Sequence, residues 1–430
     1  MILSSIITII VLQSKIVGSK EEEENKKNTS KIQTFPISDN LEVIKENIII
    51  NTNSPQVISK EEKLINKALK LHSQGNIQEA AKYYQYIIEQ DYKDPRVFSN
   101  YGLILKYQGK LKEAELFTIK AIEIDPNYTH AKINLDLIAR QNVPWWHINM
   151  INDTERNNYY SKALSTAINE NQNVLEIGTG SGLLSMMAID KGAKTVLSCE
   201  NNERISKVAK QIISKNGYQK QIKVINKNSK DLILGKDLPQ KVDLIISEIF
   251  SSEFVGEGIQ STILDAKNRL LKEGGKMIPE SGEIKIALLK NNYNIEKQCY
   301  AKKINKYDLT DFNRITGNKF DINGNELNLS FLSNENIAFY FDFYSEKIIH
   351  KEKIINIKVS ESGTCIGILS WIKAYLFGNV YLENNPCKSS ESHWSKPLYI
   401  FENPLDVNKG DIIQIKASLF EDRVWFELVK

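Results

Sequence analysis

Residues 173–200 read NVLEIGTGSGLLSMMAIDKGAKTVLSCE, and this stretch decides the fold. The apolar residues 174–177 predict a short buried strand, and a glycine-rich turn follows at 178–182. Residues 183–190 are good helix formers, and residues 195–199 predict a second strand with Glu200 at its carboxyl end. A strand, a glycine turn, a helix, a strand and a terminal acid form the opening unit of a dinucleotide- or nucleoside-binding sheet.

The glycines of this turn are spaced as Gly178-x-Gly180-x-Gly182, which departs from the G-x-G-x-x-G of dinucleotide sites. This spacing is typical of methyltransferases that use S-adenosylmethionine (SAM), a cofactor without a pyrophosphate. Glycines let the backbone approach a ligand closely. Glu200, 18 residues after Gly182, is placed to accept hydrogen bonds from two ribose hydroxyls. The alternative is a plain glycine turn that joins a core strand to a core helix.

Length and composition limit the number of domains and the classes of protein to which the chain can belong. A chain of 430 residues is long enough for two or three domains, because single cores stop growing near about 250–300 residues. Hydrophobic residues make up 41% and charged residues 25%, as in an ordinary soluble globular protein. The net charge of +3 gives no support for a nucleic-acid or anionic-membrane partner.

Four cysteines lie far apart in the sequence, with no C-x-x-C pair and no histidine cluster: Cys199, Cys299, Cys365 and Cys387. We therefore expect no disulfide framework and no metal site, and a reducing compartment fits better. The expected location is cytoplasmic, with the nucleus as an alternative if the organism is eukaryotic.

The amino-terminal residues read as a tail. The apolar run at residues 2–12 is shorter than the roughly 20 residues that span a bilayer, so no membrane span is expected. No Lys or Arg precedes the run and no A-x-A-like site follows it, which leaves export as the minor alternative. The charged tract SKEEEENKKNTSK comes next and predicts disorder. Residues 1–57 are predicted to be an unstructured tail.

Residues 58–141 carry an internal repeat with a period of 34 residues, the period of tetratricopeptide helix pairs. The repeated pairs are Leu69 and Leu103, Gly75 and Gly109, Ala80 and Ala114, Ile88 and Ile122, and Asp91 and Asp125. The small residues are expected where two helices of a pair approach each other. This all-α module is expected either to dock a protein or peptide or to serve as a structural cap on its neighbour.

A polar face follows the repeats. Pro144 ends the last repeat helix, because proline lacks the backbone N–H and its ring clashes with the preceding turn. Met150, Asp153, Arg156 and Asn157 then recur at intervals of three to four residues, so one helical face is expected to carry all four. Plain packing and solvation also explain such a face.

Two loops at the carboxyl ends of later strands hold further candidates, because ligands of doubly wound sheets bind at this edge. After a predicted strand at 221–226, Asn228 and Ser229 are placed to face an adenine ring. After a strand at 242–247, the loop SEIFSSEFVGEG carries Glu248 and Glu257. Paired carboxylates suit a planar cation with several N–H donors, such as a guanidinium. Solvated surface glutamates are the alternative.

The sequence pattern changes in the carboxyl-terminal part, where alternating stretches replace helical ones. Residues 142–282 are expected to form an α/β Rossmann-like SAM methyltransferase domain. Within it, Glu253 lies between the candidate glutamates Glu248 and Glu257. From 283 to 430, alternating stretches such as NIAFYFDFY and DIIQIKASLF predict a β-barrel. A polar loop within it carries His393 and Trp394, and such a pair in a β-domain is more often core or surface filler.

Together these residues resemble the protein arginine methyltransferases, from about Trp145 to Lys430. The motifs, in the order of that family, are MINDTERN at 150–157, VLEIGTGSG with Glu200, SEIFSSEFVGEG, and SHW at 392–394. Ser392 stands where most members have Thr. The loop at 248–253 departs from the S-E-W-M-G-Y of asymmetrically dimethylating members. It looks closer to members with two tandem catalytic modules, which make monomethyl- or symmetric dimethylarginine and one of which carries tetratricopeptide repeats.

The resemblance implies SAM as the cofactor and a protein or peptide arginine as the substrate. It implies that Arg156 holds the SAM carboxylate and that Met150 packs beside the reacting methyl group. The rest of the implied cofactor set is Glu176, Gly178, Gly180, Gly182, Glu200, Asn228 and Ser229.

The resemblance also implies the substrate side of the site. Glu248 and Glu257 would hold the guanidinium, Asp153 and His393 would remove its proton, and Trp394 would wall the pocket. Members with one catalytic module usually form head-to-tail homodimers through an arm, for which residues 305–336 are the candidate. Two rival functions stay open: a SAM enzyme that acts on a small molecule or another side chain, and a catalytically silent repeat scaffold.

Overall fold

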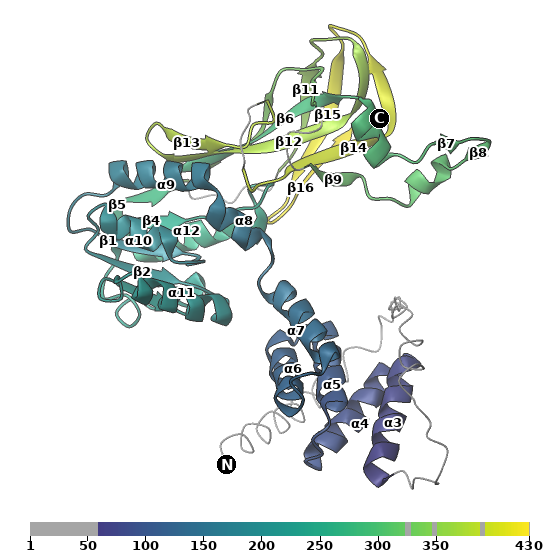
Figure 1. Ribbon diagram of the computed structural model, residues 1–430. Coiled ribbons are helices and arrows are strands. Elements are labelled where there is room, and N and C mark those ends of the chain that lie inside the picture. The colour runs from purple at the N-terminus through teal and green to yellow at the C-terminus, as the bar shows by residue number, and fades with distance from the viewer. Residues whose placement is uncertain (1–58, 323–327, 346–350, 388–391, 430) are drawn as a thin grey trace. The chain divides into compact units, whose positions relative to one another are not determined.

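The computed structural model describes residues 59–322, 328–345, 351–387 and 392–429 (Figure 1). The predicted tail at residues 1–57 lies outside these residues. Within them, no helix has both the length and the apolar character needed to cross a membrane. The chain divides into two compact units, Met1–Ala139 and Arg140–Lys430.

Five helices form the described part of the first unit (Figure 1). They are α3 (Lys60–Ser73), α4 (Ile77–Glu89), α5 (Pro95–Tyr107), α6 (Leu111–Ile124) and α7 (Thr129–Asn142). The ends of α3 and α5 are 34 residues apart, as are the starts of α4 and α6, so the helices follow the period seen in the sequence. The identification as tetratricopeptide repeats stays a prediction.

The expectation that Gly75 and Gly109 mark close helix contacts is wrong. Each lies in the turn between paired helices with φ of +80° and +75°, and a Cβ there would meet no atom within 4 Å. These turns need glycine for its left-handed conformation. The close approach occurs instead at Gly102, where a Cβ would lie 2.4 Å from Oγ1 of Thr118. Of the predicted small residues, Ala80 and Ala114 are fully buried.

A five-stranded parallel sheet lies at the start of the second unit (Figure 1). Its strands are β1 (Asn173–Ile177), β2 (Thr195–Cys199), β3 (Ile222–Ile225), β4 (Val242–Ser247) and β5 (Leu271–Ile278), in the order β3-β2-β1-β4-β5. The accompanying helices are α8 (Trp146–Asn152), α9 (Thr154–Ala167), α10 (Leu183–Asp190), α11 (Glu203–Lys215) and α12 (Ile259–Leu270). The strand order reverses between β1 and β4, and ligands bind at such a switch point.

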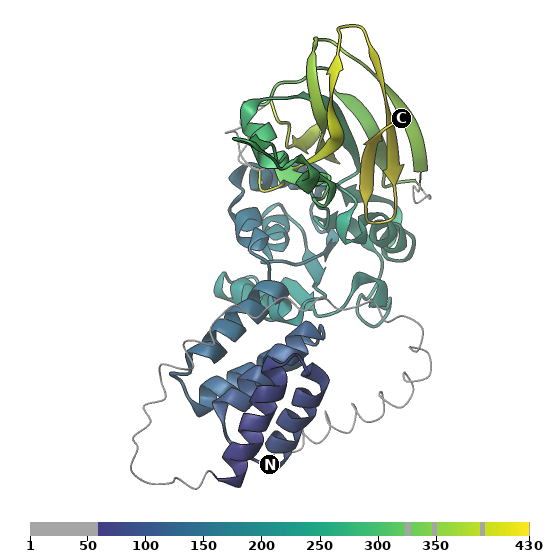
Figure 2. The same ribbon diagram turned by 90° about the vertical axis from the view of Figure 1, so that its right-hand side faces the viewer.

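Antiparallel sheets make up the remainder of the second unit (Figures 1 and 2). A six-stranded sheet contains β6 (Ser281–Lys290), β9 (Lys319–Ile322), β10 (Asn336–Asp342), β12 (Gly363–Phe377), β13 (Val380–Glu383) and β14 (Lys396–Val407). A three-stranded sheet contains β11 (Lys351–Lys358), β15 (Ile412–Leu419) and β16 (Val424–Leu428). The prediction that residues 283–430 are rich in β-strands is confirmed. Closure of these strands into a barrel stays a prediction.

The loop after β4 is packed against the antiparallel part. The ring of Phe254 is fully buried, and Cζ of this ring would lie 2.0 Å from a Cβ at Gly282 in β6. Phe254 also contacts the rings of Phe341 and Phe343, with centroids 5.2 Å and 5.9 Å away. Phe254 has a φ of +66°, so this packing holds a backbone conformation that costs a non-glycine residue energy. The loop that carries Glu248 and Glu257 is thereby fixed between the two kinds of sheet.

Candidate functional site

A cavity of about 490 Å³ opens at the carboxyl ends of β1, β2 and β4. Most of the residues singled out in the sequence line it. They are Met150, Arg156, Glu176, Gly178, Gly180, Glu200, Asn228, Ser229, Glu248 and Glu257. Pairing of Ile177 with Ser247 places the glycine turn after β1 beside the glutamate loop after β4. Parallel strand register therefore brings a predicted cofactor site and a predicted substrate site into one cavity.

The three glycines of the turn have different roles. All three have positive φ, of 83° at Gly178, 52° at Gly180 and 82° at Gly182. A Cβ at Gly178 would lie 2.7 Å from Cγ2 of Ile249, so this glycine lets the turn approach the loop after β4. Gly182 does not line the cavity, and its predicted part in shaping the cofactor turn stays a prediction. It starts α10, and a Cβ there would clash at 2.8 Å with Ile213 in α11.

Glu200 lies at the end of β2 with its carboxylate turned back to the glycine turn. Its Oε2 accepts the Gly180 N–H at 3.3 Å and its Oε1 accepts the Asn202 N–H at 2.8 Å. Glu200 lines the cavity, and each of its carboxylate oxygens keeps a second lone pair for a donor from a ligand. This geometry suits the predicted contact with a ribose.

Glu176 is a buried carboxyl group in β1 that also lines the cavity. Its Oε2 accepts hydrogen bonds from Ser198 Oγ, at 2.7 Å, and from Ser185 Oγ. Burial raises the pKa of Glu176 to about 7, although the serine hydroxyls oppose this shift. Glu176 therefore exchanges a proton near neutral pH.

Asn228 and Ser229 lie in the loop after β3. Oδ1 of Asn228 accepts the Lys230 N–H at 3.0 Å and caps the short 3-10 helix Ser229–Asp231. Ser229 is buried, and its carbonyl accepts Nη2 of Arg269 at 3.1 Å. The loop is thus held by backbone contacts at the cavity wall.

The prediction of one helical face for Met150, Asp153, Arg156 and Asn157 is wrong. α8 ends at Asn152, and Asp153 takes an extended conformation with φ −69° and ψ 91°. The Asp153 carboxylate then caps α9 by accepting the Arg156 N–H at 2.8 Å. Asp153 is therefore a helix cap between two short helices, a use for which aspartate is favoured.

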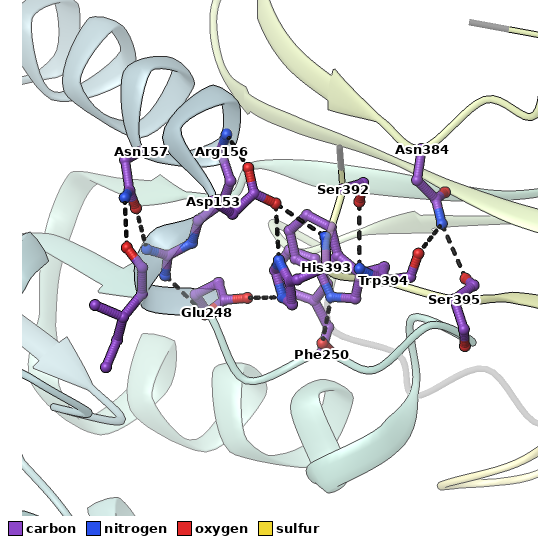
Figure 3. Close-up of polar contacts among 11 residues, drawn as sticks. Asp153, Arg156, Asn157, Glu248, Phe250, Asn384, Ser392, His393, Trp394 and Ser395 are labelled. Carbon is purple, nitrogen blue, oxygen red and sulfur yellow. Dashed lines mark hydrogen bonds and ion pairs between the residues drawn. The ribbon is translucent and has the colours of Figure 1, made fainter. Parts of the chain in front are cut away.

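Four side chains close a ring of polar contacts at this cap (Figure 3). Oδ2 of Asp153 lies 2.9 Å from Nδ1 of His393 and accepts the His393 backbone N–H at 3.1 Å. Nε2 of His393 lies 3.7 Å from Oε1 of Glu248. Oε2 of Glu248 accepts Nη2 of Arg156 at 2.7 Å, and Arg156 returns to Asp153 through its backbone. The side chains of all four are at most 6% exposed.

Charge and burial act in opposite directions within this ring. Burial alone would raise the pKa of Asp153, but hydrogen bonds from the ring of His393 and from two backbone N–H groups outweigh it and lower the pKa. Burial alone would lower the pKa of Arg156, but the charge and hydrogen bond of Glu248, together with the charges of Tyr160 and Asp153, outweigh it and raise the pKa. Arg156 lines the cavity. Its Nε is buried and has no hydrogen-bond partner among the described residues. A buried donor of this kind is suited to an anionic group of a ligand.

Glu248 and Glu257 share the cavity but differ in their surroundings. No hydrogen bond or ion pair joins the Glu257 carboxylate to another residue of the described chain, and φ of Glu257 is +62°. Although the residue as a whole is exposed, the protein atoms around its carboxyl group raise the pKa, and the charges of Glu248 and Glu200 raise it further. A cation placed between Glu248 and Glu257 would relieve this repulsion.

Trp394 is buried rather than open to the cavity. Its Nε1 donates to the Phe250 carbonyl at 3.2 Å, and its ring stacks on Phe250 with centroids 5.2 Å apart. Trp394, like Asp153 and His393, is not among the residues that line the cavity. Glu253 is also not a solvated residue: it forms an ion pair with Lys319 at 2.9 Å and accepts a hydrogen bond from Tyr399.

Two cavity residues, Trp146 and His147, had no signal in the sequence beyond their place before a polar face. Trp146 and His147 line the cavity and stack with ring centroids 3.8 Å apart. Asn157 accepts Nη1 of Arg156 at 2.7 Å through Oδ1 and donates to the Ile151 carbonyl at 2.9 Å. Asn157 thus orients Arg156 and joins the end of α8 to α9.

The chain is similar to several known proteins. Residues 160–301 match the family model described as Ribosomal protein L11 methyltransferase (PrmA). Over 282 residues the chain is 30% identical to an arginine N(omega)-methyltransferase of Streptomyces achromogenes subsp. streptozoticus, covering 65% of this chain and 78% of that protein.

Longer relatives match over part of their length. Protein arginine N-methyltransferase 9 of Mus musculus is 32% identical over 205 residues, which cover 47% of this chain and 24% of that protein. Protein arginine N-methyltransferase 7 of Oryza sativa subsp. indica is 30% identical over 319 residues, which cover 66% of this chain and 44% of that protein. The match thus spans less than half of each of these two relatives.

A solved structure shows the same fold. It is described as the Trypanosoma brucei PRMT1 enzyme-prozyme heterotetrameric complex with AdoHcy, and it superposes with a TM-score of 0.56 at 20% identity. The superposition covers 63% of this chain and 86% of that one.

Proposed function

The chain belongs to the protein arginine N-methyltransferase family, whose cofactor is SAM, and we propose that it transfers a methyl group from SAM to a guanidinium nitrogen of a protein arginine. The observation that carries the proposal is the cavity itself. It joins the glycine turn and Glu200 to Glu248 and Glu257, so a nucleoside site and a pair of carboxylates share one space.

The residues of the cavity fit SAM. The unbonded buried Nε of Arg156 suits the SAM carboxylate, and Glu200 suits the ribose hydroxyls. Gly178 and Gly180 let the turn approach the ligand, Met150 lies beside Gly180, and Asn228 and Ser229 wall the adenine end. When bound, SAM supplies an electrophilic methyl group on a sulfonium.

Glu248 and Glu257 would hold the substrate guanidinium. A free guanidinium is cationic and a poor nucleophile, with a pKa above about 12. Two carboxylates that accept its N–H groups fix its plane and draw its delocalised charge away from the attacking nitrogen. By holding the guanidinium in one orientation, the two carboxylates would position the attacking nitrogen for methyl transfer, and such positioning can supply much of the acceleration.

The ring at Asp153 offers a route for the proton. Transfer forms a N–C bond, breaks a S–C bond and releases one proton from the guanidinium. Oε1 of Glu248 faces Nε2 of His393 at 3.7 Å, and Asp153 holds Nδ1 of the same ring. His393 accepts the proton near Glu248, and the Asp153 carboxylate stabilises the imidazolium that results.

We propose monomethyl- or symmetric dimethylarginine as the product, because the loop at 248–253 departs from that of asymmetrically dimethylating relatives. The test incubates the full chain with SAM and arginine-containing peptides and identifies the products by mass spectrometry. Methylarginine supports the proposal, and its isomer identifies the product type. Asymmetric dimethylarginine would contradict the product assignment alone.

A second candidate is favoured by the match to the ribosomal protein L11 methyltransferase model, namely methyl transfer to another protein side chain. Methyl groups found on lysine or at a chain amino terminus, and none on arginine, would favour this candidate. Absence of both methylation and SAM binding by calorimetry would favour the silent repeat scaffold.

We propose a homodimer formed through an arm at 305–336. The described residues next to and within this arm include β7 (Lys303–Ile304), β8 (Tyr307–Asp308) and the 3-10 helix Thr310–Arg314, which project from the antiparallel part in Figure 1. Five apolar side chains in this region are at least 44% exposed: Ile304, Tyr307, Leu309, Phe312 and Ile315. Light scattering should find a dimer, and Phe312→Asp with Ile315→Asp should give a monomer.

A further inference from the structure

The guanidinium of Arg269 joins two segments that lie far apart in the sequence. Arg269 is the penultimate residue of α12, and it bonds to a loop after β3 that comes 37 to 40 residues earlier. Nη1 donates to the Leu232 carbonyl at 2.8 Å, and Nη2 donates to the carbonyls of Ser229 at 3.1 Å and Lys230 at 3.3 Å. An arginine in the last turn of a helix can serve the carbonyls of its own helix, whereas Arg269 holds the backbone of another element.

Asp265 fixes the plane of this guanidinium. Its two carboxylate oxygens accept Nε at 2.7 Å and Nη2 at 2.6 Å, which makes a fork-to-fork pair between residues four apart in α12. Both side chains are partly exposed, at 37% for Arg269 and 26% for Asp265. Exposed ion pairs of this kind contribute little to stability. The pair instead gives the guanidinium one orientation, in which its other N–H groups meet the loop.

The loop has few backbone hydrogen bonds of its own. Residues 229–231 form a single 3-10 turn with two backbone hydrogen bonds, of 3.0 Å and 3.2 Å. Apart from Arg269, no described residue donates to the carbonyls of Lys230 and Leu232. A 3-10 turn has poorer hydrogen-bond geometry than an α-helix and is weakly held by its own contacts. Arg269 therefore supplies the contacts that fix the backbone of this loop.

The same loop lines the cavity. Asn228 and Ser229 are cavity residues, and so is Thr262 of α12. Thr262 lies two helical turns before Arg269 and on the same helix face. The backbone N–H and Oγ of Ser229 make no hydrogen bond with another described residue, so both are available to a ligand. Arg269 thus ties the cavity wall at Asn228 and Ser229 to the helix that supplies Thr262.

We propose that Arg269 is a positioning residue for SAM, which fixes the loop at Asn228 and Ser229 against α12 and so shapes the wall that receives the adenine ring. Arg269 does not line the cavity itself, so it acts through the loop backbone and not on the reacting atoms. A gap of about 0.5–1 Å between a ring and its wall already forfeits roughly a quarter to a half of their dispersion attraction. The inference rests on the proposed placement of the adenine end, and it does not depend on which group accepts the methyl.

The test compares the full-length chain with Arg269→Met. The Kd for SAM, measured by calorimetry, should rise about tenfold, and KM for SAM should rise with it while kcat at saturating SAM stays within about twofold. 5′-Methylthioadenosine keeps the adenosine half of SAM and lacks the amino-acid half, so its Kd should rise by the same factor. Arg269→Lys keeps the charge but not the planar fork, and it should give an intermediate Kd. A variant that only loosened the fold would lower kcat and Tm without this split.

Asp265 gives a second test, because it acts through Arg269. Asp265→Asn should raise the Kd for SAM by a few fold in the parent and should change nothing further in the Arg269→Met background. Asn268→Ala, at the exposed position beside Arg269, is the matched control and should bind SAM as the parent does. If Arg269→Met does not fold by circular dichroism, Arg269→Lys and Asp265→Asn decide the question.

The proposal fails if Arg269→Met and Arg269→Lys bind SAM and 5′-methylthioadenosine as the parent does. It also fails if kcat falls while both Kd values stay unchanged, or if the effects of Asp265→Asn and Arg269→Met add. Weaker binding of SAM alone would place the effect at the amino-acid half of the cofactor and would overturn the inference. The expected shifts in Kd, found in a chain that forms no methylarginine, would support the role of Arg269 and overturn only the proposed reaction.

Discussion

Nδ1 of His393 lies 2.9 Å from Oδ2 of Asp153, although 240 residues separate them in the chain. Asp153 is the helix cap before α9, and His393 precedes the strand β14 of the antiparallel part. The contact therefore ties the junction of α8 and α9 to the segment just before β14. Through Nε2 of His393 it extends to Glu248 at 3.7 Å.

Glu257→Gln should lower kcat for arginine methylation by at least about 100-fold, because one of the two charges proposed to orient the guanidinium is lost. SAM affinity and thermal stability should stay close to those of the parent, since the Glu257 carboxylate makes no hydrogen bond with the rest of the described chain. Radiolabelled methyl transfer and calorimetry measure the two effects. Glu155→Gln, at an exposed position at the start of α9, serves as control. Full activity of Glu257→Gln would remove the proposed role of this carboxylate.

Arg156→Met should destabilise the fold by about 3–5 kcal/mol, because it removes the cation 2.7 Å from the buried Glu248 carboxylate. It should also weaken SAM binding. Chemical denaturation gives the free energy of unfolding. Lys207→Met breaks an exposed pair with Glu203 and should change stability by no more than about 0.5 kcal/mol. Equal losses in the two variants would show that burial adds nothing to the Arg156 pair.

Glu176 should make stability fall as pH rises from about 4.5 to 7. Its folded-state pKa of about 7 exceeds the unfolded value near 4.5, so in this window the folded chain holds a proton that the unfolded chain has released. Above this window the loss amounts to about 3 kcal/mol, from 1.36 kcal/mol per pKa unit. Urea titrations across the window should show a shallower slope in Glu176→Gln. Glu273→Gln, at an exposed site in β5, should keep the parent slope.

Gly282→Ala should destabilise the second unit by about 1–3 kcal/mol and lower kcat, since the new Cβ would meet the Phe254 ring at 2.0 Å. The displaced ring would shift the loop that carries Glu248 and Glu257. Gly317→Ala is the matched control, because a Cβ there meets no atom within 4 Å and φ is not positive. Differential scanning fluorimetry and steady-state kinetics compare the two. A Gly282→Ala protein as stable and active as the control would show that the ring contact is dispensable.

Asn157→Ala should weaken SAM binding by about tenfold while kcat at saturating SAM changes little, because Asn157 orients Arg156 through a 2.7 Å hydrogen bond but does not touch the reacting atoms. Asn158→Ala, at the exposed next position, should bind SAM as the parent does. A fall in kcat without a change in SAM affinity would contradict the orienting role.

The local elements of the second unit follow closely from the sequence. α10 begins and ends where the run of helix formers does, and β2 and β4 match the predicted bounds residue for residue. Periodicity and propensity act over neighbouring residues, so these elements need no knowledge of the rest of the chain. The 34-residue offset of the first unit is likewise visible in both sequence and helix bounds.

The misplaced residues share one cause. Gly75 and Gly109 are predicted at close helix contacts, yet the contact of a glycine depends on which element packs above it. The face shared by Met150 and Arg156 was broken at Asp153, because a capping aspartate can end one helix and begin the next within the same spacing. The stack of Trp394 on Phe250 joins residues 144 apart in the chain, and no local pattern reports it.

The amino-acid sequence by itself determined the strand–turn–helix unit at 173–200, the period of the repeats and the identity of the acids that face the cavity, since these follow from short-range preferences and motif spacing. Only the tertiary structure decided that Glu248 pairs with Arg156, that His393 meets Asp153, and that Glu257 keeps its carboxylate without a partner in the described chain. Those contacts depend on strand order and on how the loop after β4 packs against the antiparallel sheet, which bring together residues far apart along the chain.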